Sequence, residues 1–365
     1  MRSFVYDALP GRVVFGLGAS RETLADEVER LGKEKVFLVA TEHERALAEE
    51  LAKPLGDRVI GVFTGVRPHV PVEVAGAARD SARGAGADCL LCVGGGSTTG
   101  TAKAVALETK LPIVAVPTTY AGSEMTPVWG TTEKQRKTTG VSRDVLPKVV
   151  VYDPELTFTL PFNITGTSAM NAMAHCVEAF YAPGANPITS LVAEEGIRAL
   201  ARGVPEAVDS PEKVEGRSDT LYGAYLAGAA FAVAGSGLHH KICHVLGGAY
   251  DLPHADTHTV VLPHVAAFNE PAIPGVLDRV SRALGLDTGA NGAAAGLYDL
   301  ADRIGAPTAL KDIGMKEEDL EEAVGLIMEK VPEDNPRPVD EAGVREILEG
   351  AFEGRRPAPI VERSA

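Results

Sequence analysis

The stretch from Gly237 to His264 gathers most of the imidazole side chains of this chain. It holds six of the nine histidines: His239, His240, His244, His254, His258 and His264. His240 and His244 stand four residues apart, so on a helix their side chains share one face. Imidazoles can bind a metal ion, polarise a carbonyl oxygen or move a proton near neutral pH. Their density here favours a functional site over scattered core or capping histidines.

A second motif, Asn171-Ala-Met-Ala-His175, lies upstream in a helical pattern. Asn171 and His175 are one helical turn apart, and Glu178 follows three residues later. The pair Asn171 and His175, together with His240, His244 and the Pro253-His254 pair, would form a metal-binding set if Asn171 were acidic. The sequence therefore predicts a site that includes Asn171 and several imidazoles.

A glycine-rich loop and a threonine pair indicate a nucleotide site. Gly94-Gly95-Gly96-Ser97 stands between an apolar strand pattern and a helical one, where glycines and helix N–H groups can approach a pyrophosphate. This GGGS run is not the GxGxxG fingerprint and lacks the GK[ST] of a P-loop. Thr118 and Thr119 follow the next apolar strand, at the sheet edge where open α/β sheets bind ligands.

The order of strand and helix patterns predicts two domains. Residues 1–160 alternate near-continuous apolar strands with helices, which is typical of a parallel sheet covered on both faces. Residues 161–365 show helical periods alone. We therefore expect an N-terminal Rossmann-like α/β nucleotide domain, at 1–160, followed by an all-α catalytic domain, at 161–365.

Composition excludes several classes of protein. The net charge is −15 and no cluster of Lys and Arg supplies a basic face, so no nucleic-acid partner is expected. No apolar run approaches the roughly twenty residues of a membrane span. The segment MRSFVYDALPGRVVFG lacks the apolar core of a signal peptide, and Cys89, Cys92, Cys176 and Cys243 fit buried free thiols. A cytoplasmic protein is expected.

The chain resembles the iron-containing, group III alcohol dehydrogenase family over nearly its whole length. The resemblance rests on GGGS at 94–97, PTTYAGSE at 117–124, NAMAHCVEA at 171–179 and HKICHVLGGAYDLPH at 240–254. Within this family it is most similar to the maleylacetate reductase branch, through GGGSTTGTAKA, the asparagine of NAMAH, and GLHHKICHVLGG with PHADTH. The resemblance implies the two-domain fold shared with dehydroquinate synthase.

The resemblance also implies site residues. The usual family site places one Asp and three His around Fe²⁺ or Zn²⁺, and the matching positions here are Asn171, His175, His240 and His254. An amide in place of the carboxylate removes the negative ligand, so activity without a bound metal is expected. Gly100 and Ala255 also depart from the common Asp and Gly. The cofactor contacts implied by the motifs are Gly94, Gly95, Gly96, Ser97, Thr118, Thr119 and Lys137, the last lying ten residues before Pro147.

The implied reaction is reduction of the carbon–carbon double bond of maleylacetate, a dicarboxylate, to 3-oxoadipate. Hydride addition at the β-carbon moves charge onto the conjugated ketone oxygen, which needs hydrogen-bond donors. We assign this task to His175, His240 and His254, with Asn171 orienting them, and proton donation to His244. No acidic residue is expected at the Ala40-Thr41 strand end to repel a 2′-phosphate, so both NADH and NADPH are expected to serve.

Two alternatives remain at this point. The first is a metal-dependent alcohol dehydrogenase acting on a small alcohol or aldehyde, which Asn171 and the doubled His239-His240 argue against. The second is a non-catalytic nucleotide-binding or metal-storage protein, which the dense histidine motif disfavours. A homodimer is expected from the family alone. The upstream aromatic pathway, the tolerance for chlorinated maleylacetates and the residues that bind the substrate carboxylates cannot be assigned from the sequence.

Overall fold

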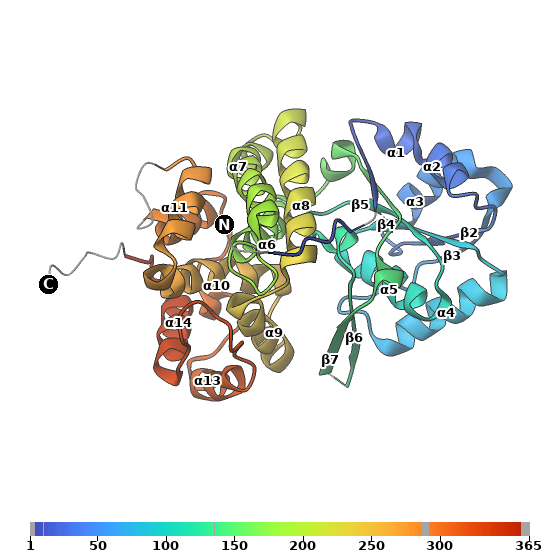
Figure 1. Cartoon of the computed structure of the whole chain (residues 1–365). Helices are drawn as coiled ribbons and strands as arrows, with labels where there is room; N and C mark the ends of the chain where they lie inside the picture. Colours follow the sequence, from blue (N-terminus) through green and yellow to red (C-terminus); the bar gives the residue numbers. More distant parts are fainter. Residues whose placement is uncertain (1–3, 10, 135, 287–291, 359–365) are drawn as a thin grey trace, which may run out of the picture. The chain divides into compact units, whose positions relative to one another are not determined.

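The structure is a computed structural model that describes residues 4–9, 11–134, 136–286 and 292–358 (Figure 1). The chain divides into two compact units, described here one at a time: an α/β unit, Ala8–Leu160, and a helical unit made of Pro161–Ala365 together with Met1–Asp7. This differs from the predicted 1–160 range at its start. Residues 4–7 group with the helical unit. There Tyr6 contributes, after burial and Tyr222, to the raised pKa of Tyr225.

The α/β unit is built on a six-stranded parallel sheet, which confirms the predicted fold class. Its order is β1-β8-β5-β4-β2-β3, and every pairing is parallel. The strands are β1 (Arg12–Phe15), β2 (Val36–Val39), β3 (Val59–Phe63), β4 (Cys89–Gly94), β5 (Ile113–Pro117) and β8 (Val149–Tyr152). Every residue of the four central strands, β8, β5, β4 and β2, is buried, because helices cover both faces of such a sheet.

Short helices connect these strands (Figure 1). They are α1 (Ala19–Glu22), α2 (Leu24–Arg30), α3 (Arg45–Ala52), α4 (Val72–Ala85) and α5 (Gly96–Thr109). Pro71 precedes the first residue of α4, where a missing N–H costs nothing. Gly86, with a φ of 72°, ends the same helix in the left-handed conformation. Because the strands are parallel, each connecting helix returns the chain to the end of the sheet at which every strand begins.

The sequence analysis does not predict the antiparallel hairpin that follows β5. It consists of β6 (Val128–Glu133) and β7 (Arg136–Val141) and forms a separate two-stranded sheet. Its strands, VWGTTE and RKTTGV, lack the alternation of apolar and polar residues that marks a half-buried strand. The hairpin is therefore recognised by its antiparallel backbone pairing and not by an apolar face in its sequence.

The helical unit contains no strand among its described residues, as predicted. Its helices are α6 (Phe162–Glu178), α7 (Pro187–Asp209), α8 (Val214–Ala234), α9 (Leu238–Tyr250), α10 (His254–Asn269), α11 (Pro274–Ala283), α12 (Ala293–Arg303), α13 (Leu320–Met328) and α14 (Glu341–Glu353). One core joins α9 and α10 to α13 and α14 through buried aliphatic residues. This core fixes the two helices that carry most of the histidines.

Helices α7 and α8 approach each other closely because glycines face the contact. A methyl group on Gly203 would lie 2.6 Å from the backbone nitrogen of Thr220, and one on Gly223 would lie 2.6 Å from Cγ of Leu200. Real side chains do not tolerate such distances, so only glycine fits. The Ala and Gly content of α8 permits this close packing.

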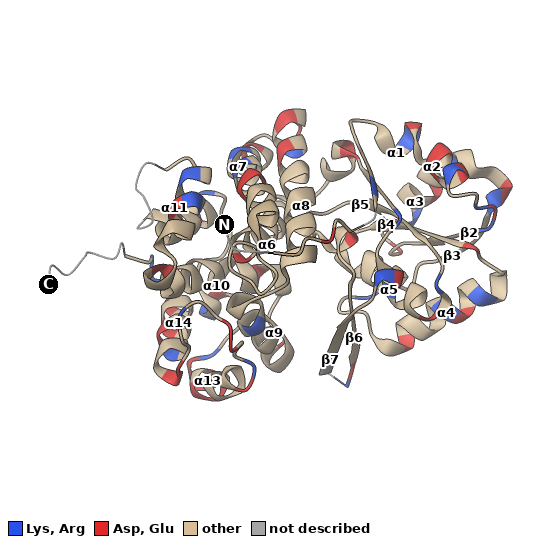
Figure 2. Cartoon of the chain, in the orientation of Figure 1, with Lys and Arg blue, Asp and Glu red and all other residues tan. Residues whose placement is uncertain are grey.

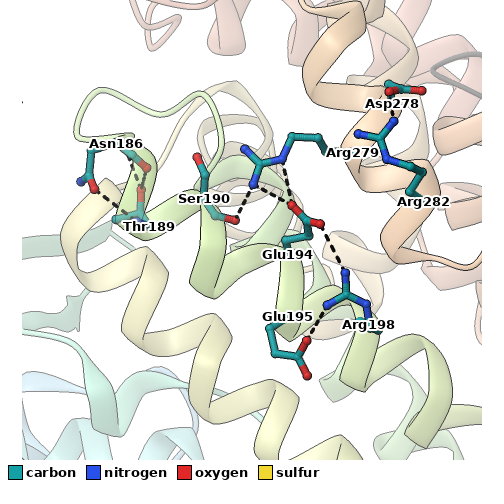
Figure 3. Close-up of polar contacts among 9 residues, drawn as sticks. All are labelled: Asn186, Thr189, Ser190, Glu194, Glu195, Arg198, Asp278, Arg279 and Arg282. Atoms are coloured by element: carbon teal, nitrogen blue, oxygen red, sulfur yellow. Dashed lines mark hydrogen bonds and ion pairs between the residues drawn. The ribbon is translucent and has the colours of Figure 1, made fainter. Parts of the chain in front are cut away.

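Polar contacts fix the start of α7 and join it to α11 (Figure 3). The Asn186 side chain accepts hydrogen bonds from the backbone N–H groups of Ile188 and Thr189, which caps the helix. Arg279 of α11 donates to Glu194 of α7 at 2.6 and 2.8 Å, and its guanidinium lies 4.9 Å from the centre of the Phe180 ring. These contacts hold α7, on which α6 packs.

Residues of both charges are mixed on the helices. Figure 2 shows Lys and Arg interspersed with Asp and Glu along α2, α4, α7 and α14.

The four cysteines are free and buried, as predicted, and burial raises the pKa of both Cys89 and Cys92 to about 12. Among the described residues no single helix has the length and apolarity needed to cross a membrane; only α8 and α9 pass that test jointly, as a pair bent by 101°.

Candidate active site

Three helices of the helical unit bring imidazoles together, as the sequence predicts. Helix α6 carries Asn171 and His175, α9 carries His239, His240 and His244, and α10 carries His254 and His258. These six imidazoles form a histidine cluster. Helix α9 runs on through Gly247 and Gly248 and ends at Tyr250, with Asp251 as its C-cap at a φ of 54°.

The rings of the cluster lie in contact in a continuous chain. The His175 and His240 rings are stacked with centres 5.1 Å apart, and the Phe231 ring of α8 lies beside both. The His258 ring lies 4.7 Å from the His240 ring and 4.4 Å from the His254 ring. The His244 and His254 rings are stacked at 6.4 Å. The predicted residues His175, His240, His244 and His254 therefore share one site.

The cluster has a buried part and an exposed part. His175, His239, His240 and His258 are buried, whereas His244 and His254 are exposed. Burial lowers the pKa of His175 to about 4 and that of His239 to about 3, because an imidazolium loses its hydration. Burial, reinforced by the neighbouring imidazoles, also lowers the pKa values of His240 and His258. The buried imidazoles are therefore neutral at pH 7, and each offers one donor and one acceptor.

Glu178 holds the start of α9 in place. Its carboxylate accepts hydrogen bonds from the backbone N–H groups of Gly237, at 3.0 Å, and His239, at 2.8 Å, and it also contacts Nδ1 of His240. Burial raises the pKa of Glu178 to about 7 against the opposing effect of these backbone bonds. The carboxylate fixes the proton of neutral His240 on Nδ1, so Nε2 presents a lone pair. That Nε2 atom has no hydrogen-bond partner among the described residues.

The buried pair His239 and His258 was given no role from the sequence. Nε2 of His239 and Nδ1 of His258 are 2.8 Å apart, so one imidazole donates to the other. His258 stands four residues after His254, and this i, i+4 spacing is the signal that could have placed it in the site. His264 does not join the cluster. Its Nδ1 lies against Gly350 of α14, so it is a packed core histidine.

The donor set matches a divalent metal ion poorly. Oδ1 of Asn171 and Nδ1 of His175 are buried without partners among the described residues, as is Nε2 of His240, so polar atoms are available to a ligand. All of these atoms are neutral. The carboxylate against the cluster, Glu178, is already engaged by α9. A dication held by these atoms would have no negative ligand to balance its charge.

The glycine loop of the α/β unit forms a backbone cradle at the end of β4. Gly94 has a φ of 151°, and a side chain there would overlap Thr98 and the Glu44 carboxylate. Side chains on Gly95 and Gly96 would press on Thr119 and Ala121, at 3.0 and 3.2 Å. Ser97 follows in the first turn of α5, whose N–H groups favour a phosphate. Oγ1 of Thr98 is buried without a partner among the described residues. These features fit a bound nucleotide.

The other predicted cofactor residues lie on segments that follow β5. Thr118 comes directly after β5 and donates through Oγ1 to Oε1 of Glu44 at 2.7 Å. Thr119 lies against Gly95. Lys137 lies on β7, opposite Thr132, with its aliphatic chain beside Gly130. The Thr132 N–H donates to the carbonyl of Val70, so the hairpin is joined to the loop that precedes α4.

A buried lysine anchors the threonine loop. Lys103 of α5 donates through Nζ to the carbonyl oxygens of Ser123, Thr126 and Val128, at 2.6, 2.8 and 2.8 Å. Burial lowers its pKa to about 7, although the Glu124 carboxylate opposes the shift. These three hydrogen bonds fix the segment between β5 and β6, because without them the buried ammonium group would lack hydrogen-bond acceptors.

Position 100, where the family usually has Asp, lies in close packing in this chain. A methyl group on Gly100 would lie 2.8 Å from Cγ2 of Val70. Val70 and His69 precede α4 with φ values of 50° and 61°, which is a strained backbone for residues with side chains. Val70 therefore fills the space that a longer residue 100 would need.

The structure corrects one expectation about the nucleotide site. The strand end at Ala40-Thr41 was expected to lack an acidic group, and this is wrong, since the Glu44 carboxylate accepts a hydrogen bond from the Thr41 hydroxyl at 2.9 Å. The acid stands three residues beyond the strand end, at the start of α3, so inspection of the strand end alone misses it.

Comparisons with known proteins agree with this arrangement. A model of iron-containing alcohol dehydrogenases matches residues 10–154, and one of the C-terminal part of the same family matches residues 165–352. A maleylacetate reductase of Sphingobium indicum is 48% identical, covering 97% of this chain and 99% of its own. The crystal structure of a maleylacetate reductase from Agrobacterium tumefaciens is 45% identical, covers 98% of this chain and 100% of its own, and has a TM-score of 0.93.

More distant relatives share the same fold. A sulfoacetaldehyde reductase from Bifidobacterium kashiwanohense, solved in complex with NAD⁺, is 26% identical with a TM-score of 0.88, and the match covers 95% of this chain and 98% of its own. The family models together cover most of the chain, and the maleylacetate reductases match it from end to end. On these grounds the chain belongs to the iron-containing alcohol dehydrogenase family.

Proposed function

We propose that this enzyme is an NAD(P)H-dependent reductase that converts maleylacetate to 3-oxoadipate. The observation that carries the proposal is Asn171, buried with an unpartnered Oδ1 beside neutral imidazoles, where the metal-dependent members of the family have a carboxylate. The end-to-end similarity to maleylacetate reductases supports the same substrate. The reaction consumes one proton and one hydride per double bond reduced.

The substrate chemistry explains why imidazoles suffice. When bound, the reduced nicotinamide supplies a hydride to the carbon β to the ketone. The electron pair of the double bond then moves onto the ketone oxygen, which becomes an enolate. Collapse of the enolate with uptake of a proton at the α-carbon completes the saturated product. The protein must therefore stabilise an oxygen anion and deliver a proton, and neither task requires a metal ion.

The buried part of the cluster suits the first task. A neutral imidazole donates through one nitrogen only, so the tautomer decides which atom faces the substrate. Because Glu178 engages Nδ1 of neutral His240, Nε2 of this ring accepts hydrogen bonds and does not donate them. We therefore assign the donors to the oxygen anion to His175 and the side-chain amide of Asn171, with His240 beside them.

The exposed part suits the second task. His244 and His254 are exposed, so they can exchange protons with water between turnovers. The contacts from His254 through His258 to His240 connect this part to the buried imidazoles. We assign proton donation to His244, with His254 stacked against it.

The α/β unit holds the nucleotide in this proposal. The cradle at Gly94, Gly95 and Gly96 and the first turn of α5 at Ser97 would hold the pyrophosphate. Thr118 and Thr119 would contact a ribose, and Lys137 would contact the cofactor from the hairpin. We infer that NADH and NADPH can both serve, although not equally well. We also infer that no metal is needed, since the donor set lacks a negative ligand.

A metal-dependent alcohol dehydrogenase is the competing function. It predicts reduction of small aldehydes and loss of activity on chelation. The two functions are separated by following NADH absorbance with maleylacetate or with a short aldehyde, before and after treatment with a chelator. We expect turnover with maleylacetate alone and no loss on chelation. Turnover restricted to the aldehyde, or abolished by the chelator, would overturn the proposal.

We further propose that the enzyme acts in the cytoplasm as a homodimer, on a small dicarboxylate. Four buried free thiols fit a reducing compartment. Light scattering coupled to size-exclusion chromatography measures the assembly directly.

A further inference from the structure

We infer that Glu44 is a specificity-determining residue that makes the nucleotide site favour NADH over NADPH. Its carboxylate would accept a hydrogen bond from the free 2′-hydroxyl of the adenosine ribose and repel a 2′-phosphate. The inference rests on the proposed function only in requiring that a nicotinamide dinucleotide binds at the glycine cradle.

The carboxylate of Glu44 lies where three strands of the sheet end. Oε2 accepts from Oγ1 of Thr41, after β2, at 2.9 Å, and Oε1 accepts from Oγ1 of Thr118, after β5, at 2.7 Å. Strand β4 stands between β2 and β5, so the carboxylate spans its carboxyl end. A methyl group on Gly94, the last residue of β4, would lie 2.6 Å from Oε2. Open parallel sheets bind dinucleotides at this edge.

An unsatisfied hydroxyl beside the carboxylate points to an absent ligand. Thr98 is 1% exposed, and its Oγ1 has no hydrogen-bond partner among the described residues. It contacts the same face of Gly94 as Glu44 does. Buried hydroxyls are rarely left unpaired unless a ligand or water completes them. A sugar hydroxyl group can donate to Glu44 and accept from Thr98 at the same time.

The charge around the site selects a hydroxyl over a phosphate. Both threonine hydroxyls donate to Glu44, so its side chain has spare acceptor sites for a further hydroxyl group. The nearby cation, Arg45, is engaged by Glu49 at 2.8 Å and lies 3.8 Å from Glu42. A 2′-phosphate adds a charge of about −1.5 to −2 at neutral pH, so it would meet a fixed negative group with no free partner from Arg45.

The test measures binding rather than turnover. Dissociation constants of the full-length enzyme for NADH and NADPH are obtained from nicotinamide fluorescence, for the parent and for Glu44→Gln. We expect the parent to prefer NADH by about tenfold or more, as like charges in partial solvent exposure cost on the order of 1.4 kcal/mol. In Glu44→Gln the preference should shrink, chiefly because NADPH binds more tightly. Glutamine keeps the length of the side chain and one acceptor for a threonine.

A matched control stands two residues away. Glu42→Gln removes the same charge from the exposed side of the same loop, so it should leave the ratio of the two dissociation constants unchanged. Rising salt should reduce the preference of the parent, because charge repulsion is screened. If Glu44→Gln does not fold, Glu44→Ala carries the same expectation.

The outcomes separate the two proposals. A parent that binds neither cofactor overturns the proposed function together with this inference. A parent that binds NADH and NADPH equally, a preference unchanged in Glu44→Gln, or an equal change in Glu42→Gln overturns the role of Glu44 and leaves the proposed function standing.

Discussion

At the residue scale, one substitution separates this chain from the metal-dependent pattern of its family. Asn171 keeps the size of an aspartate and presents the same oxygen, but it carries no charge. Its Oδ1 is buried and unpartnered among the described residues, as are Nδ1 of His175 and Nε2 of His240. A buried carboxylate at this position would need a cation or a proton, whereas the amide needs neither.

Asn171→Asp is therefore expected to increase the amount of bound divalent metal. The change restores a negative ligand to a set that already holds His175 and His240. Metal content per protein chain is measured after purification in medium containing iron and zinc, with Asn171→Ala as the control that removes the oxygen without adding charge. If the Asp variant is as poor in metal as the parent, the four matched groups do not surround one point.

His244→Ala is expected to slow hydride transfer without weakening NADH binding. Loss of a proton donor typically lowers the rate by about a hundredfold to ten-thousandfold. Alanine is the best helix former, and His244 is exposed, so α9 should persist. Single-turnover NADH oxidation and NADH binding are measured on the same samples.

His254→Ala is the companion variant, because its ring is stacked on His244. A near-parental rate in His244→Ala together with a slow His254→Ala would transfer the role of donor to His254. Weakened NADH binding in His244→Ala would instead make that residue a cofactor contact.

At the element scale, the position of the site depends on the close contact of α7 and α8, on which α6 packs. Gly203 sits in this contact with the backbone of Thr220, while Gly325 of α13 has open space around it. Replacing glycine by alanine should therefore have opposite effects on the stability of the helical unit at the two positions.

Gly203→Ala is expected to destabilise the helical unit by about 1–3 kcal/mol, as inserting a methyl group into a full contact does. Gly325→Ala should stabilise it by about 0.5–1 kcal/mol, because alanine is favoured over glycine in an exposed helix. Thermal unfolding followed by circular dichroism measures both. A loss of stability in Gly325→Ala of the same size as in Gly203→Ala would show that crowding is not the cause.

Apolar runs in the sequence predict the parallel strands of this chain, because strands that are buried on both faces of a sheet need apolar side chains on both faces. The hairpin β6–β7 escapes prediction, because its threonine-rich strands have no apolar face. The histidine spacing predicts which imidazoles share a helix face, and the structure brings His175, His240, His244 and His254 together. The roles of Glu178 and Glu44 could not be predicted, because they arise from contacts between separate segments. The spacing of His258 from His254 could have placed His258 in the site, but its pairing with His239 could not be predicted.

At the scale of the whole molecule, the proposed function assigns a separate task to each unit. In this proposal the α/β unit holds the nucleotide, and the helical unit supplies the proton chemistry. The net charge of −15 opposes a dicarboxylate substrate, so local donors must outweigh the overall field. The low pKa values of the buried imidazoles also link the stability of the helical unit to pH.

Acid should unfold this protein partly through its buried histidines. A histidine whose folded-state pKa is lowered keeps its stabilising effect above the ordinary pKa of 6.5 and loses it as the pH falls toward the folded value. Burial lowers the pKa of His264 to about 4, and Arg355 adds to the shift. Between pH 6.5 and about 4, His264 binds a proton in the unfolded chain but not in the folded chain. The free energy of unfolding therefore declines as the pH falls through this range.

His264→Leu is the variant that isolates this effect, because His264 packs against α14 outside the cluster. At pH 5 the parent should have lost about 2 kcal/mol through this residue, relative to neutral pH, and the variant should be spared that loss. Urea unfolding at pH 7 and pH 5 measures the difference, and His43→Leu, at an exposed position, should behave as the parent does. Equal losses in the parent and in His264→Leu would mean that His264 is protonated in the folded state at pH 5, and that its burial does not oppose the charge.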